Sequence, residues 1–194
     1  MPNDYRDVLQ GICNAYRSIA SFFVGFGFGA KLVPKTGRTS SCFAMNGNFF
    51  DPVVSDYEQL YNSYSKTLQE VELSLPVNCE SIYNMACDYA EYEKHNHEAR
   101  NYFVLIVISP GVVDDLEASL EAVSRAAELP LSVLIVKVGN VQLEDVNDPA
   151  EMLKKSEDLF EESERGYIDL VSYEDFKKED TAAFEHELIK RIPD

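Results

Sequence analysis

Apolar residues follow two different periodicities along the chain. From Asp4 to Ala20 they recur at helical spacing, which predicts an opening helix with Asn3 or Asp4 as its N-cap. Residues 102–108 (YFVLIVI) and 131–139 (LSVLIVKVG) are instead near-continuous apolar runs, and a helical segment over 116–127 separates them. Uniformly apolar strands with a helix between them predict a parallel sheet that is covered on both faces.

A glycine-rich aromatic run, FFVGFGFGA, occupies residues 22–30. It predicts a buried strand whose glycines let other backbone approach closely, and SCFAMNG at 41–47 predicts a short edge strand that ends at Asn46-Gly47. A dinucleotide-binding loop needs GxGxxG spacing in the turn between a strand and a helix, whereas KLVPKTG follows this run. We therefore interpret the glycines as packing residues.

Further helices are predicted on both sides of the two apolar runs. Ser55 with Glu58 forms a capping box that starts one helix, a second spans 79–93, and a third starts at Asp148. The last strand is predicted over 168–173 and a terminal helix over 181–192. The residues predicted to face inward are Tyr57, Leu60, Tyr61, Tyr64 and Leu68, then Ile82, Met85, Ala86 and Tyr89, and finally Phe184, Leu188 and Ile192.

The order of these elements predicts an α/β fold, a doubly wound and mostly parallel sheet flanked by helices. The chain has 194 residues and is 45% hydrophobic, which is enough to build one domain with a sizeable core. We therefore expect a single domain over residues 1–194.

The charge balance restricts the kinds of partner. With 17 basic and 34 acidic residues the formal charge is −17, which disfavours binding to nucleic acid and direct adsorption to an anionic membrane. A basic or neutral protein partner fits better, or a cation. The acidic run over 144–164 predicts a solvated surface, and a binding role for it is the alternative.

Cysteine and histidine spacing gives no sign of a zinc site or of a catalytic centre. The four cysteines (Cys13, Cys42, Cys79 and Cys87) contain no CxxC pair, so we expect buried thiols in a reducing compartment. Cys79 stands at a predicted helix start, where a thiol pKa is lowered, but no motif fixes a histidine base near it. No enzyme is predicted.

A calcium loop and a targeting segment are also not predicted. Residues 145–156 cluster acidic and amide side chains, but they place Pro149, Ala150 and Ser156 where a calcium loop needs a ligand, glycine and glutamate. The first ten residues are polar and carry acidic side chains, unlike a signal peptide, and no run approaches the ~18 apolar residues of a membrane span. We expect a cytoplasmic protein.

Several segments together resemble the von Willebrand factor A-type domain of copines. The resemblance runs in order along nearly the whole chain. It is carried by GFGA at 27–30, LSLPVN at 73–78, NYFVLIVISPGVVDDL at 101–116, AAELPLSVLIVKVGN at 126–140, VSYEDF at 171–176 and IKRIPD at 189–194.

The resemblance implies a metal-ion-dependent adhesion site at the carboxyl edge of the sheet. In copines the second loop of that site resembles Pro-Thr-Asn and the third resembles Thr-Asp-Gly, where this chain has Pro76-Val77-Asn78 and Ser109-Pro110-Gly111. Val77 then replaces a hydroxyl ligand by a hydrocarbon, and Pro110 replaces a carboxylate by a ring that cannot coordinate. The resemblance therefore implies a degenerate site with no metal cofactor, neither Mg²⁺ nor Ca²⁺.

The resemblance also implies parts that this chain lacks. The family's first strand and its Asp-x-Ser/Thr-x-Ser loop would precede Asn3, and that strand would lie between the strands predicted at 22–29 and 102–108. We expect the sheet to close over the gap, to pair with another chain or to be marginally stable. Copines carry C2 domains for calcium-dependent phospholipid binding, so recruitment to the plasma membrane would come through linked C2 domains or a partner.

Two function classes remain open. The first is a non-catalytic protein-interaction module that presents the loops at the carboxyl edge, with Val77, Asn78, Pro110 and Asp114 as the contact residues. The second is a cation site rebuilt from Asn78, Ser109, Asp114 and Asp115, with calcium-linked membrane recruitment. Either aspartate is alternatively the cap of the helix that follows it.

Overall fold

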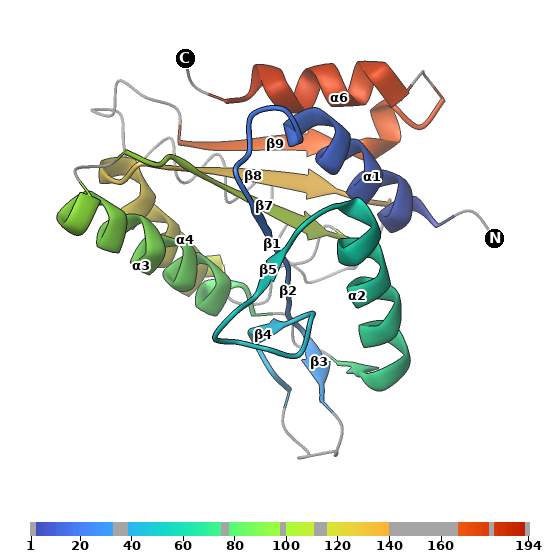
Figure 1. Cartoon of the computed structure of the whole chain (residues 1–194), viewed down its shortest axis with the longest axis horizontal. Helices are drawn as coiled ribbons and strands as arrows, with labels where there is room; N and C mark the ends of the chain where they lie inside the picture. The colour runs from blue at the N-terminus through green and yellow to red at the C-terminus, as the bar shows by residue number, and fades with distance from the viewer. Residues whose placement is uncertain are drawn as a thin grey trace. The chain divides into compact units, whose positions relative to one another are not determined.

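The chain divides into two compact units, Met1–Asn78 and Cys79–Asp194, which we call unit 1 and unit 2. A computed structural model describes residues 3–32, 39–74, 78–97, 100–110, 116–139, 167–178 and 181–192. Both units mix helices and strands, as the predicted α/β class requires (Figure 1). The single domain over 1–194 remains a prediction.

Two helices belong to unit 1, α1 (Asp4–Tyr16) and α2 (Tyr57–Glu70). Asn3 is the N-cap of α1, as predicted, because its side-chain oxygen accepts a hydrogen bond from the backbone N–H of Tyr5 at 3.1 Å. The helix ends at Tyr16, so the predicted extension to Ala20 is wrong.

The cap of α2 differs from the prediction by one residue. Asp56, not Ser55, is the N-cap, and its carboxylate accepts a hydrogen bond from the backbone N–H of Gln59 at 2.8 Å. The Gln59 side chain in turn accepts a hydrogen bond from the backbone N–H of Ser55 at 2.7 Å. The cap bond is therefore present one position later than the sequence suggested, but the return bond of the Gln59 side chain goes to the residue before the cap and not to the cap itself. Of the five residues predicted to face inward, Leu60 is buried, whereas Leu68 is 42% exposed.

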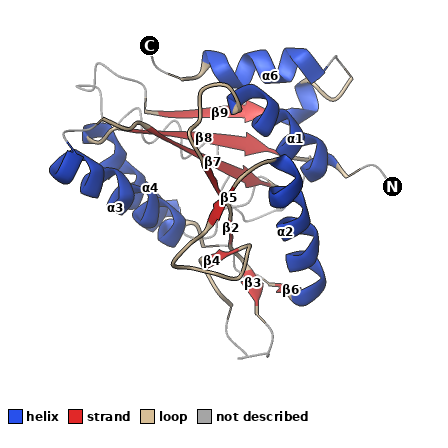
Figure 2. Cartoon of the chain, in the orientation of Figure 1, coloured by secondary structure: helices blue, strands red, loops and turns tan. Residues whose placement is uncertain are grey.

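Unit 1 contains three antiparallel pairs of very short strands instead of the predicted strand over 22–30. β1 (Phe23–Val24) pairs with β5 (Val53–Val54), β2 (Phe26–Gly27) with β4 (Phe43–Ala44), and β3 (Ala30–Lys31) with β6 (Glu72–Leu73). Each two-residue strand between residues 23 and 31 therefore pairs with a different partner strand. In Figure 2 the arrows of these strands are much shorter than the three arrows of the parallel sheet in unit 2.

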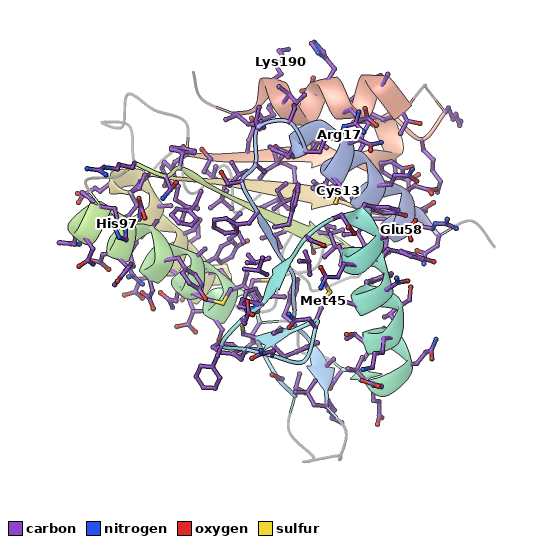
Figure 3. All side chains as sticks on the ribbon, in the orientation of Figure 1. Cys13, Arg17, Met45, Glu58, His97 and Lys190 are labelled. Carbon is purple, nitrogen blue, oxygen red and sulfur yellow. The ribbon has the colours of Figure 1, made fainter. Side chains whose placement is uncertain are left out.

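Close packing around two glycines holds these pairs, as the sequence predicted. A Cβ at Gly25 would lie 2.6 Å from Met45 Cε, and a Cβ at Gly27 would lie 2.5 Å from Phe43 Cζ. Met45, labelled in Figure 3, also joins the strands to α2, because its carbonyl accepts a hydrogen bond from the Thr67 hydroxyl at 3.0 Å. Side chains larger than hydrogen do not fit at either glycine without displacement of a neighbour.

Unit 2 contains the parallel sheet. Its strands are β7 (Phe103–Ser109), β8 (Leu131–Lys137) and β9 (Ile168–Ser172), hydrogen-bonded in the order β7-β8-β9. Six consecutive residues of β8, Leu131 to Val136, are buried, so this central strand is covered on both faces as predicted. Among the described residues β7 pairs with β8 on one side, and both the loss of the family's first strand and its effect on the sheet remain predictions.

The helices in the described part of unit 2 are α3 (Glu80–His97), α4 (Leu116–Ser124), which continues as the 3₁₀ turn η1 (Arg125–Glu128), and α6 (Thr181–Lys190). In Figure 1 the sheet lies between α6 and the pair formed by α3 and α4. A second 3₁₀ turn, η2 (Tyr173–Asp175), follows β9, and the ring of Phe184 in α6 lies 5.2 Å from that of Tyr173.

The buried face of α3 is rotated by one residue from the predicted one. Ile82 is buried as predicted, but the other fully buried apolar positions are Tyr83, Cys87 and Ala90, and Tyr89 is 42% exposed. The helix also continues through His97, beyond the predicted end at residue 93.

Two arginines link helices of unit 2 to neighbouring elements through hydrogen bonds. Arg125 donates hydrogen bonds to Asn84, Asp88 and Glu91 of α3 over 2.7–3.0 Å. Arg191 donates to both carboxylate oxygens of Asp169 in β9, at 2.7 and 2.6 Å, and so ties the end of α6 to the sheet.

None of the helices in the described part of the chain has the length and the apolar character that a membrane span needs. The helix predicted from Asp148 and the acidic run over 144–164 lie outside the described residues.

Candidate functional site

The three parallel strands end at the same level, which defines the carboxyl edge of the sheet. In the register, Ser109 of β7 is opposite Lys137 of β8, and Lys137 is opposite Ser172 of β9. The backbone N–H of Val138 donates to the carbonyl of Ser109 at 2.9 Å, which extends the pairing by one residue. Gly139 then takes φ +87°, a left-handed conformation that favours glycine.

Two of the predicted site residues, Ser109 and Pro110, lie together at this edge. Ser109 is the last residue of β7 and is 1% exposed, so its hydroxyl is closed off from solvent. Pro110 follows it and is half-buried. A proline ring has no atom that coordinates a cation, so the position directly after β7 offers no side-chain ligand.

Of the other predicted site residues, the structure describes Asn78 alone. Asn78 is exposed and is the last residue of unit 1, two positions before α3 begins. Val77, Asp114 and Asp115 lie outside the described residues. Their grouping with Ser109 and Pro110 therefore remains a prediction.

Lys137 is an edge residue that the sequence analysis missed. It ends β8 between the two serines of the register and is half-buried. Its position brings a positive charge to the edge at which the family's site would bind a cation, and like charges repel. The available signal was the apolar run LSVLIVK, because the first charged residue after a buried parallel strand marks the strand's carboxyl end.

Only part of the predicted cation site belongs to the described residues. Among the described residues no group of three or more histidine, cysteine, aspartate or glutamate side chains is placed to hold a metal ion. Asp114 and Asp115 lie outside those residues, so the rebuilt cation site stays an open alternative.

The cysteines do not provide an activated nucleophile. All four are thiols, and Cys13, Cys79 and Cys87 are buried. Burial raises the pKa of Cys13 and of Cys87 to about 11, so neither is a thiolate at neutral pH. Cys79, the residue considered as a nucleophile from its place before α3, is 1% exposed.

Glu93 is a buried carboxylate that is hydrogen-bonded to residues at and just after the end of α3. It accepts hydrogen bonds from the backbone N–H and the side-chain amide of Asn101, at 3.0 and 2.9 Å, and lies 3.0 Å from Nδ1 of His97. Burial favours the neutral acid, but the hydrogen bonds from Asn101 and His97 outweigh it, so the pKa of Glu93 is lowered. The carboxylate therefore ties the end of α3 (His97 is labelled in Figure 3) to the chain entering β7.

The aromatic side chains of unit 1 include one conspicuous exposed residue that the sequence analysis also missed. Phe50 is 98% exposed, in the turn between β4 and β5. The signal was NGNFFD, in which two phenylalanines follow a turn sequence outside any predicted helix or strand.

A comparison with models of protein families supplies the remaining finding. The family model described as Copine matches residues 1–194, which is the whole chain. The match agrees with the resemblance seen in the individual segments and with the mixed α/β architecture and its parallel sheet.

Proposed function

Because the chain belongs to the copine family, we propose that it is a non-catalytic protein-interaction module whose metal-ion-dependent adhesion site is degenerate. The loops at the carboxyl edge of a doubly wound sheet make the contact. The residues of that contact are Val77, Asn78, Pro110 and Asp114.

Pro110 is the observation that supports the proposal most directly. It stands at the end of β7, at the edge where parallel sheets bind their ligands, and its ring supplies neither charge nor coordinating oxygen. Lys137 adds a positive charge to the same edge. A surface of this kind favours a contact that does not depend on a cation.

The absence of turnover is part of the proposal. The high pKa of Cys87 and the burial of Cys79 speak against thiol chemistry, and Glu93 is held by Asn101 and His97. The proposal places the protein in the cytoplasm, with any recruitment to the plasma membrane through a partner or linked C2 domains, because a charge of −17 opposes direct contact with anionic lipid.

Cation dependence and edge mutations test this function together. The immobilised chain should capture the same cytosolic proteins with and without chelator, and Asn78→Lys should weaken the capture. Gln69→Lys introduces the same charge at an exposed position of α2 and should leave it unchanged. Capture that requires Ca²⁺, a micromolar site for Mg²⁺, Mn²⁺ or Ca²⁺ in isothermal titration, or calcium-dependent sedimentation with phosphatidylserine vesicles would overturn the proposal.

A further inference from the structure

Residues 46–51 form a turn that hydrogen bonds hold in one conformation, and we call it the aromatic turn. The Asn46 side-chain amide donates to the carbonyl of Asp51 at 2.7 Å, and the Asn46 side-chain oxygen accepts from the N–H of Asn48 at 2.9 Å. The Asn48 side-chain oxygen accepts from the N–H of Phe50 at 3.2 Å. Asparagine side chains that bond the backbone two residues on fix such turns, so little conformational freedom is left for binding to remove.

The aromatic turn presents one phenylalanine on the support of another. Phe49 packs edge-on against Phe26, with 5.7 Å between the ring centroids, and is 51% exposed. Phe50 contacts Phe49 at 6.5 Å, again edge-on, and is 98% exposed. The ring of Phe49 therefore rests on β2, and the hydrogen-bonded backbone of Phe50 holds a second ring out in water.

Two further apolar side chains of unit 1 are exposed, on β1 and on β5, the strand that follows the aromatic turn. Val24 and Val53 are directly opposite each other in the register, and each is 44% exposed. The neighbouring pair has Val54 at 1% exposure, so alternation along the strands directs Val24 and Val53 outward.

In the sequence on either side of the aromatic turn, the charged residues are all acidic. From Thr39 to Ser65 the sequence contains no lysine or arginine, whereas it contains Asp51, Asp56 and Glu58. The chain as a whole carries −17. Anionic membranes and a second copy of the chain are both disfavoured by this charge, and a basic protein surface is favoured.

We propose that the aromatic turn is a second docking site, which inserts Phe50 into an apolar pocket of a protein partner whose rim carries lysine or arginine. The inference rests on the proposed function of a protein-interaction module and adds a contact remote in sequence from the sheet-edge residues. Binding hot spots are large side chains that fill a pocket of the partner, and acidic neighbours favour a partner whose rim is basic.

A peptide selection with a matched pair of variants tests the site. Random peptides displayed on phage are selected on the immobilised full chain, and peptides that also bind Phe50→Ser are removed. The remaining peptides should combine leucine, isoleucine or phenylalanine with lysine or arginine. A synthesised peptide should then bind Phe50→Ser at least about tenfold more weakly than the unchanged chain. Leu73→Ser, at a 74% exposed position of β6, should bind as the unchanged chain does.

The remaining arms decide between the occupants. Asp51→Lys should weaken binding of the basic peptide, and a peptide with glutamate in place of its lysines and arginines should not bind. The proposal is overturned if no selected peptide distinguishes Phe50→Ser, if both peptides bind alike, or if Phe50 drives sedimentation with phosphatidylcholine or phosphatidylserine vesicles. If every selected peptide also binds Phe50→Ser, and these peptides lose binding to Asn78→Lys, the second site is refuted while the sheet-edge function stands. Unchanged far-ultraviolet circular dichroism checks the fold of each variant.

Discussion

The two units use β-structure in opposite ways. Unit 2 has strands of seven, seven and five residues in one parallel ladder, and the central strand is buried along nearly its whole length. Unit 1 has strands of two residues in separate antiparallel pairs. Its exposed large apolar residues include Phe22, Phe49, Phe50 and Leu73, whereas three of the four in the described part of unit 2 are tyrosines with a polar hydroxyl.

The difference indicates which part of the chain resists unfolding and which part offers apolar surface. A two-residue strand pair is not stable by itself, so unit 1 depends on helix contacts and on the close packing at Gly25 and Gly27. A buried ladder such as that of β7, β8 and β9 withstands local opening far better. Unit 2 is therefore the scaffold, and unit 1 leaves side chains in water that a partner can cover.

The largest expected effect comes from a cavity in the scaffold. Ile135 is 1% exposed in β8, so Ile135→Ala should lower the free energy of unfolding by about 3 kcal/mol. Val53→Ala removes apolar side chain at a 44% exposed position of unit 1 and should change it by less than about 0.5 kcal/mol. Urea unfolding followed by circular dichroism measures both. Equal losses in the two variants would contradict the contrast between the units.

A smaller effect is expected from crowding in unit 1. Gly27→Ala brings a Cβ within 2.5 Å of the Phe43 ring, and overpacking of this kind costs about 2 kcal/mol. Phe43→Leu removes part of the ring, so the double variant should be more stable than Gly27→Ala alone. The same urea titration tests the pair. If the double variant is less stable than the sum of the two single changes predicts, the glycine is not required by the ring.

The smallest effect should appear only in acid, in unit 2. The pKa of Glu93 is lowered in the folded chain, so the carboxylate stabilises the fold above its ordinary pKa of 4.5, and this stability is lost as the pH falls further. Glu93→Gln should reduce the fall in stability between pH 5 and acid. Glu121→Gln, at an exposed position of α4, should keep the full pH dependence. Urea midpoints measured across this pH range compare the three chains, and an unaltered profile in Glu93→Gln would refute the assignment.

The parallel sheet was predictable because the residues of its strands favour buried β-structure over the alternatives. Uninterrupted runs of valine, isoleucine and leucine bounded by turn residues have few alternatives to buried strands, and the strands lie within one or two residues of the predicted ranges. The run over 22–30 offered no such certainty, since glycine does not indicate which strand its backbone approaches. Likewise, Ser55 and Asp56 are both good caps, and local sequence does not choose between neighbours.

The candidate site was predictable only where it followed from strand ends. Pro110 lies at the carboxyl end of β7 because the run before it is a strand. Lys137 was missed because it was counted as part of the apolar run, and only the register shows that it is level with Ser109. Phe50 was missed for a different reason, because hydrophobic patterns are interpreted as burial and this residue is almost wholly exposed.

The register of the parallel sheet also governs how the chain folds while it is being synthesised. β8 leaves the ribosome well before β9, yet Val133 and the residues after it pair with the strand that begins at Ile168. Parallel pairing across such a long connection has to wait for the second strand and costs loop-closure entropy when it forms. A nascent chain that has not yet reached Ser172 therefore exposes one side of its most apolar strand, which makes it a client for chaperones until the last strand arrives.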